Sequence, residues 1–387
     1  MSTNIITRPG TKIKLPKASI ENLLREVAHS WDVYLPLKKI GGDVWFEALP
    51  EGGGEGGERD AELVAVFKTM ALGDEDIVIS PKDIFFPQLD LMFEFDGGNI
   101  SQNIEQSPVF LFGVKACDLR GIRFADNFFS RNPSDIYYLS RIQERFIVTI
   151  GCLNPPRPDA CFCTSVNTGP FAEGGYDLQL IDGGEDYFVE VGSKKGEEFL
   201  ETFKQFFKRV EISNPDVESI KSKAWDSVTL KVDFAQALEY MTQDVSVVDK
   251  IYKRIGERCI YCGGCVYVCP TCTCFNVFDD TKEGEKGQNR EKEQVEQEGQ
   301  SLQGKRYRNW DACVFLGYTR EASGHNPREE RWVRASRRYE HKLKSDCTVS
   351  GMSGCIGCGR CLSSCPVNIG MSTFIQELLW EMGADNR

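Results

Sequence analysis

The chain has 387 residues, an apolar fraction of 41% and a formal net charge of −12, which is typical of a globular protein of two or three domains. The acidic balance argues against a nucleic-acid partner, because binding to phosphates requires a basic surface or patch. No apolar run reaches the ~20 residues that a membrane-spanning helix needs, and the N-terminus lacks the apolar segment of a signal peptide. We therefore expect a soluble, cytoplasmic protein with no membrane span.

The first hundred residues predict a mixed arrangement of helices and strands. A serine followed by apolar residues at helical spacing predicts a helix over 19–28. Apolar and β-branched stretches predict strands over 31–37 and 43–49, and a further strand over 59–68. The aromatic-rich stretch 82–95 is expected to pack against the core.

Two later apolar runs, 107–114 and 145–150, have the composition of strands that are buried on both faces. The first run leads to Cys117, where a helical pattern begins, and the second leads directly to Cys152. If the two strands are parallel, both cysteines lie at the carboxyl edge of one sheet. Open α/β sheets bind their ligands at this edge.

A Cys-x-Cys pair follows after a proline-rich loop, so four cysteines can meet at this rim. They predict a [4Fe-4S] cluster, held by Cys117, Cys152, Cys161 and Cys163. Two alternatives stay open: zinc also occupies four-cysteine sites, and free cysteines are often buried simply as apolar groups. The tight spacing of Cys161 and Cys163 leaves one of them as a possible bystander.

The segment between this rim and the next cysteines predicts further mixed structure. Alternating residues around an Asp-Gly-Gly-Glu turn predict a hairpin over 176–191. Helical patterns follow over 194–209, 219–238 and 247–255. We place the main domain boundary near residue 245.

Two copies of the pattern Cys-x2-Cys-x2-Cys-x3-Cys-Pro follow, starting at Cys259 and Cys355. This run is the bacterial iron–sulfur signature, in which the fourth cysteine ligates the cluster of the other run. Sixteen cysteines in a cytosolic chain also favour metal ligands over disulfides. Two [4Fe-4S] clusters are predicted, the first on Cys259, Cys262, Cys265 and Cys365 and the second on Cys355, Cys358, Cys361 and Cys269.

A long insertion separates the two copies. Residues 279–305 are rich in Glu, Lys, Gln and Gly and predict an exposed, flexible loop. Residues 306–345 carry aromatic side chains that can pack on the cluster-binding core. Their basic stretch, 328–338, predicts a solvated face or a surface for an acidic partner. The remaining cysteines are expected to pack near the clusters rather than to bind them: Cys272, Cys274, Cys313 and Cys347.

Several motifs stand in order beside the paired repeats: Val-Lys-Ala-Cys-Asp-Leu-Arg-Gly at 114–121, Gly-Cys-Leu-Asn-Pro-Pro at 151–156, Cys-Pro-Thr-Cys-Thr-Cys-Phe at 269–275, and Trp-Asp-Ala-Cys at 310–313 with Gly-His-Asn-Pro-Arg at 324–328. This combination resembles the family of 4Fe-4S dicluster electron-transfer subunits of anaerobic sulfite reductase, which includes the beta subunits of cytosolic [NiFe] sulfhydrogenases. The resemblance implies a subunit that relays electrons between two partners. One is a flavin subunit with FAD and a [2Fe-2S] centre, which oxidises NAD(P)H. The other is a catalytic subunit of the sirohaem sulfite reductase or [NiFe] hydrogenase type.

These observations predict an α/β (or α+β) N-terminal domain over 1–245, followed over 246–387 by an α+β two-cluster ferredoxin-like domain with a long insertion. The expected function is electron transfer within an oxidoreductase complex, without catalytic residues of its own, because no phosphate loop, dinucleotide fingerprint or catalytic carboxylate pair is evident. Alternatives are a subunit of another anaerobic flavin-based complex, a redox-sensing or structural iron–sulfur protein, and an enzyme that binds a small molecule in its N-terminal region.

Overall fold

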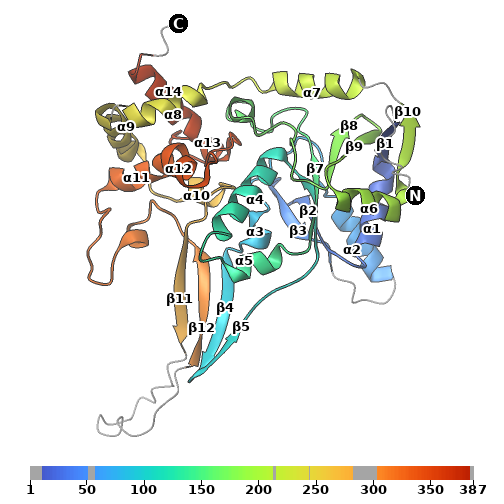
Figure 1. The fold of residues 1–387 in the computed structure, drawn as a ribbon, viewed down its shortest axis with the longest axis horizontal. Coiled ribbons are helices and arrows are strands. Elements are labelled where there is room, and N and C mark those ends of the chain that lie inside the picture. The colour runs from blue at the N-terminus through green and yellow to red at the C-terminus, as the bar shows by residue number, and fades with distance from the viewer. Residues whose placement is uncertain (1–10, 51–56, 212–214, 244, 282–302, 384–387) are drawn as a thin grey trace.

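The structure is a computed structural model and describes residues 11–50, 57–211, 215–243, 245–281 and 303–383. An eight-stranded sheet dominates the N-terminal half, with the strand order β10-β1-β9-β8-β7-β6-β2-β3 (Figure 1). Its strands, in chain order, are β1 (Thr11–Pro16), β2 (Asp32–Lys38), β3 (Val44–Ala48), β6 (Val109–Val114), β7 (Arg145–Ile150), β8 (Leu178–Asp182), β9 (Asp186–Val191) and β10 (Lys208–Glu211).

The centre of this sheet is parallel, because β2, β6, β7 and β8 run in one direction. Every residue of β6 is buried, as the continuous apolar run requires for a strand that is covered on both faces. One face packs against α1 (Ile20–Val27), α2 (Gly57–Phe67) and α6 (Lys194–Thr202). The other packs against α3 (Lys82–Phe85), α4 (Ala116–Phe129) and α5 (Ile136–Arg141). The parallel pairing expected for the two apolar runs is present.

Two predicted elements of this half were wrong. The stretch 59–68 is not a strand but lies within α2, where Leu63 and Phe67 are one helical turn apart and both face the core. The helix predicted over 194–209 ends at Thr202, and the chain then forms the edge strand β10. In both places the short apolar runs are compatible with the spacing of a helix and with that of a strand, and packing against the sheet decides between the two.

A second, four-stranded sheet projects from the body as an arm (Figure 1). Its strands are β4 (Leu89–Asp96), β5 (Asn99–Gln102), β11 (Phe275–Thr281) and β12 (Gln303–Trp310), in the order β11-β12-β4-β5. Thus residues 279–281 and 303–305, at the flanks of the predicted flexible loop, belong to strands. The rest of that prediction, 282–302, lies outside the described residues.

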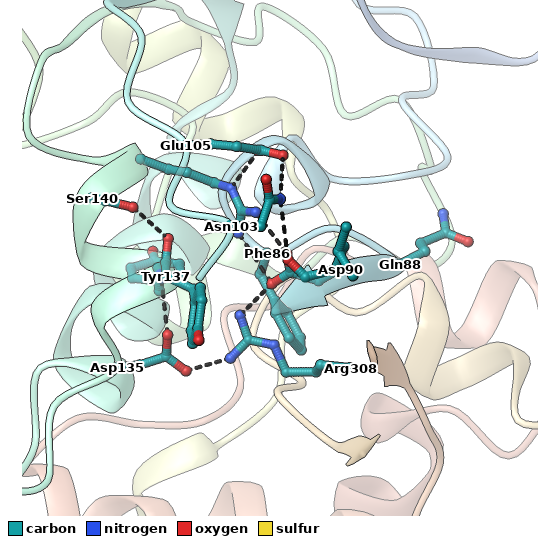
Figure 2. Close-up of polar contacts among 12 residues, drawn as sticks. Phe86, Gln88, Asp90, Asn103, Glu105, Asp135, Tyr137, Ser140 and Arg308 are labelled. Carbon is teal, nitrogen blue, oxygen red and sulfur yellow. Dashed lines mark hydrogen bonds and ion pairs between the residues drawn. The ribbon is translucent and has the colours of Figure 1, made fainter. Parts of the chain in front are cut away.

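A buried ionic network fixes the base of the arm to α5 (Figure 2). Arg308 of β12 donates to Asp90 of β4 at 2.6 Å and also pairs with Asp135, the N-cap of α5. Arg141 donates to both carboxylate oxygens of Asp90, at 3.1 and 2.6 Å, and to Glu105 at 3.0 Å. Because the charges of both arginines are balanced by carboxylates, the network can be buried without isolated charge.

The C-terminal half is mainly helical. Its principal helices are α7 (Pro215–Ser227), α8 (Phe234–Gln243), α9 (Val245–Arg258), α11 (Arg331–Glu340) and α14 (Met371–Glu381). The last four pack around one apolar cluster, whereas α7 packs against β8 and β9 of the large sheet. Three short helices lie between them: α10 (Gly264–Tyr267), α12 (Asp346–Ser350) and α13 (Arg360–Ser363). In the described part of the chain, no helix is both long and apolar enough to cross a membrane.

Candidate iron–sulfur centres

The four cysteines of the first predicted set line one cavity, here called cavity I: Cys259, Cys262, Cys265 and Cys365. The first follows α9 directly, Cys265 lies in α10, and Cys365 follows α13. The turn before α10 requires Gly263, whose φ of +77° favours a residue without a Cβ. The two repeats thus meet across this cavity, because one of its cysteines comes from the second repeat.

The second predicted set lines cavity II, which lies among α11, α13 and the second repeat: Cys269, Cys355, Cys358 and Cys361. Cys269 is buried here, and the hydrogen bond with Cys272 is the first of several contacts that hold its pKa well below the ordinary value. The charges of Lys342 and Lys82 act in the same direction. A thiolate is the form that binds metal. Cys269 lines the cavity and Cys272 does not, so the geometry favours Cys269 as the ligand and Cys272 as its neighbour.

The N-terminal set lines cavity III, at the carboxyl edge of β6 and β7: Cys117, Cys152, Cys161 and Cys163. Cys117 lies in the first turn of α4, and Cys152 lies two residues after β7. The structure brings all four to one cavity, and both members of the Cys-x-Cys pair line it.

Cavity II lies between the other two, as shared lining residues indicate. Cys265 and Arg338 line both cavity I and cavity II, and Cys358 lines both cavity II and cavity III. Among the described residues, cavities I and III share no lining residue. The three cysteine sets therefore follow one another in the order I, II, III.

Direct contacts tie cavity III to the second repeat. The backbone N–H of Phe162 donates to the carbonyl of Gly357 at 2.8 Å, and the Thr168 hydroxyl donates to the carbonyl of Ile356 at 2.6 Å. The Cys161 thiol donates to the Cys358 carbonyl at 3.6 Å. These bonds hold the two cysteine-bearing loops back to back.

The donor atoms fit a group larger than one metal ion. Within the described ranges, no three His, Cys, Asp or Glu side chains are close enough to share a single ion. Zinc would draw its four sulfur atoms to about 2.3 Å from one point. The cysteines instead surround cavities, as the four corners of a [4Fe-4S] cluster require.

Burial affects the protonation of these thiols. It raises the pKa of Cys265 to about 11, that of Cys358 to about 11 and that of Cys163 to about 12. Because cysteine binds metal as the thiolate, iron binding at these residues releases protons.

Buried cations surround the cavities, and the sequence did not predict them. The stretch 328–338 was expected to be solvated, yet Arg334 and Arg338 are buried. Lys342 lies one further turn along and is buried as well. For Arg334 and Arg338 the expectation was wrong, because they share with Lys342, at a spacing of four, one helical face that packs on the cluster-binding core. The spacing by four was the feature of the sequence that could have indicated their burial on one helical face. Arg331 is exposed, as expected.

Two buried arginines of cavity III are each paired with a carboxylate, whereas the buried Lys115 donates to the carbonyl of Gly73 at 2.5 Å. The guanidinium of Arg360 donates to both oxygens of Asp118, at 2.7 and 2.8 Å. Arg157 pairs with Asp76 and donates to the carbonyls of Cys358 and Ile77. An anionic group fits beside all these cations, since a cluster with four thiolate ligands carries net negative charge.

The other cysteines lie beside the sets without lining the cavities. Cys272, Cys274 and Cys313 pack in a small apolar cluster around α10. Cys347 lies apart from them, and its thiol donates to the carbonyl of Lys342 at 3.8 Å.

Comparisons with known proteins agree with this geometry. Residues 258–369 match the family described as a 4Fe-4S dicluster domain, which supports at least two [4Fe-4S] clusters in the chain. The chain is also 32% identical over 313 residues to sulfhydrogenase 2 subunit beta of Pyrococcus furiosus. That match covers 80% of this chain and 85% of the relative. The chain therefore belongs to the family of sulfhydrogenase beta subunits.

Proposed function

We propose that this chain is an iron–sulfur electron-transfer subunit that holds three [4Fe-4S] clusters, one in each of cavities I, II and III. The order of the cavities carries the proposal, because cavity II shares lining residues with both of its neighbours. A bound [4Fe-4S] cluster supplies one-electron uptake and release. The protein supplies the thiolate ligands, the distances between the cluster sites, and a dry surrounding that sets the reduction potential of each site.

The two ends of the series reach different surfaces. At cavity I, Cys262 is exposed and its neighbour Ile260 is 56% exposed. At cavity III, the lining includes the exposed Glu75 and the half-buried Pro155 and Pro156. Two partners can therefore dock at the same time, one at each end, and exchange electrons through the chain.

We propose that these partners are a flavin subunit with FAD and a [2Fe-2S] centre, which oxidises NAD(P)H, and a catalytic subunit of the [NiFe] hydrogenase or sirohaem sulfite reductase type. The motif resemblance and the printed name of the relative, a sulfhydrogenase subunit, support this assignment. The hydrogenase type has the stronger support, because the relative is named a sulfhydrogenase subunit.

Iron and sulfide analysis of the anaerobically purified chain tests the cluster count. About twelve iron atoms per chain are expected for three clusters, and about eight would remove the cluster in cavity III. Serine substitutions then assign the sets. Cys262→Ser, Cys358→Ser and Cys152→Ser should each lower the iron content by up to about four atoms, whereas Cys347→Ser, outside the cavities, should leave it unchanged.

Purification of the native complex tests the function. We expect a flavoprotein and a metalloenzyme subunit to co-purify with the chain in defined ratio, and added NAD(P)H to reduce its clusters. Recovery of the chain alone from the native source would contradict the relay and favour a sensing or structural role.

A further inference from the structure

Arg338 occupies a special position between the first two cysteine sets. It lies on α11, is 4% exposed, and lines both cavity I and cavity II. In cavity I it lies with Cys265 of the first repeat, and in cavity II it lies with Cys361 of the second. One guanidinium therefore faces two sites at once.

The charge of Arg338 is not balanced by a carboxylate. Its Nη2 donates to the carbonyl of Ile369 at 3.0 Å, and its Cζ lies 4.6 Å from the centre of the Tyr339 ring. In the described part of the chain, Nη1 has no hydrogen-bond partner and no acidic side chain forms an ion pair with the residue. An isolated charge at this depth is unfavourable, so an anion is expected beside it.

The two arginines at cavity III differ in this respect. Arg360 forms a two-pronged ion pair with Asp118, and Arg157 pairs with Asp76. Their positive charges are therefore largely cancelled before any anionic group binds. Lys342 at cavity II and Lys115 at cavity III also form no ion pair in the described part of the chain, but of the cations that line the three cavities only Arg338 lines two of them.

We propose that Arg338 is a positioning residue, the counter-charge shared by the clusters in cavities I and II, and that it raises the reduction potential of both. The inference rests on the proposed function. Reduction adds a negative charge to a cluster, and a cation buried beside it in a medium of low dielectric constant favours that charge. Arg338 does not line cavity III, so its contribution falls on the clusters in cavities I and II.

The test uses the full-length chain in its native complex, with Arg338→Met to remove the charge and Arg338→Lys to keep it. The control is Arg334→Met. Arg334 is buried one turn earlier on the same helix, but its guanidinium bonds to the carbonyls of Val314, Arg328 and Glu329 and does not line a cavity. Iron content is measured first, and midpoint potentials follow from redox titration monitored by EPR.

In Arg338→Met we expect two of the three midpoint potentials to fall and the third to stay. Arg338→Lys should restore most of the shift, and Arg334→Met should leave all three potentials in place. If Arg338→Met instead loses iron, retention of iron by Arg338→Lys would support the counter-charge.

Unchanged potentials, a shift of one cluster only, an equal shift in Arg334→Met, or equal iron loss in Arg338→Met and Arg338→Lys would each overturn the inference. A native protein with no iron in cavity I or II would instead contradict the proposed function, so the two failures are distinguishable.

Discussion

Gly357 shows how closely the two cysteine-bearing loops approach each other. Its φ is +65°, and a Cβ at this position would lie 2.7 Å from the backbone of Phe162 and Cys163. The same backbone forms the hydrogen bond that joins cavity III to the second repeat. A side chain at position 357 therefore cannot be added without moving cysteines of two sets.

We expect Gly357→Ala to lower the iron occupancy of cavities II and III together and to destabilise the chain by about 2–4 kcal/mol, from the strain of positive φ plus the overlap. Gly351→Ala is the matched control, because Gly351 also has a φ of +65° but has no atom within 4 Å of the added Cβ. It should cost only about 1 kcal/mol, with normal iron content. Thermal unfolding and iron analysis measure both effects, and equal behaviour of the two variants would refute the close-approach argument.

The cysteines could be predicted from the sequence, whereas the buried cations beside them could not. The cysteine spacing of the repeats predicted the residues that line cavities I and II, and the pattern of buried strands predicted those that line cavity III. That these cysteines bind clusters stays a prediction. The buried cations are not visible in this way, because Arg338 and Lys342 resemble the charged residues of a solvated helix until the packing of α11 is known. Only their spacing by four indicated a shared face.

At the level of elements, the arm is the clearest gap between sequence and structure. Its strands come from two distant segments, and β4 pairs with β12 although more than 200 residues lie between them. The sequence shows β12 as part of an insertion and β4 as an aromatic stretch, and nothing local pairs them. Strands that are matched over such a separation are set by the assembled core rather than by their own patterns.

The anchor of the arm should depend on pH through Asp90. Burial raises the pKa of this carboxyl, but the hydrogen bonds and charges of Arg141 and Arg308 outweigh it, so the folded-state pKa is lowered. A group with a lowered pKa stabilises the fold above its ordinary pKa of about 4, and this contribution is lost as the pH falls through the folded-state value.

Asp90→Asn should destabilise the base of the arm by about 3–5 kcal/mol at neutral pH, because it leaves two buried arginines with less negative charge. Hydrogen exchange of the β4 and β12 amides, compared between neutral pH and pH values below about 4, measures the effect. The difference from the native chain should shrink as the pH falls.

Glu94→Gln is the control, since its ion pair with Lys305 on the same strands is exposed and should matter little. An Asp90→Asn variant with native protection at neutral pH would contradict the anchoring role.

At the scale of the whole molecule, the order of the sites depends on how the two halves of the chain dock. Cavity III belongs to the edge of the N-terminal sheet, whereas cavities I and II belong to the crossed repeats. The sequence predicts each set but not their succession, because that depends on contacts such as Phe162 with Gly357 and Arg157 with Cys358. The docking makes the second repeat the middle of the series and leaves Cys262 at one free end.

This order predicts the magnetic interactions of the reduced protein. Clusters in neighbouring cavities should broaden and split each other's EPR signals, so the fully reduced native chain should show interactions between I and II and between II and III. Loss of the middle site in Cys358→Ser should leave two signals without such splitting, whereas loss of the end site in Cys152→Ser should leave one interacting pair.

Because Cys358 also lines cavity III, iron analysis must first show that Cys358→Ser retains about eight iron atoms. Splitting that survives in such a variant would mean that cavities I and III are direct neighbours, and the series I, II, III would have to be abandoned.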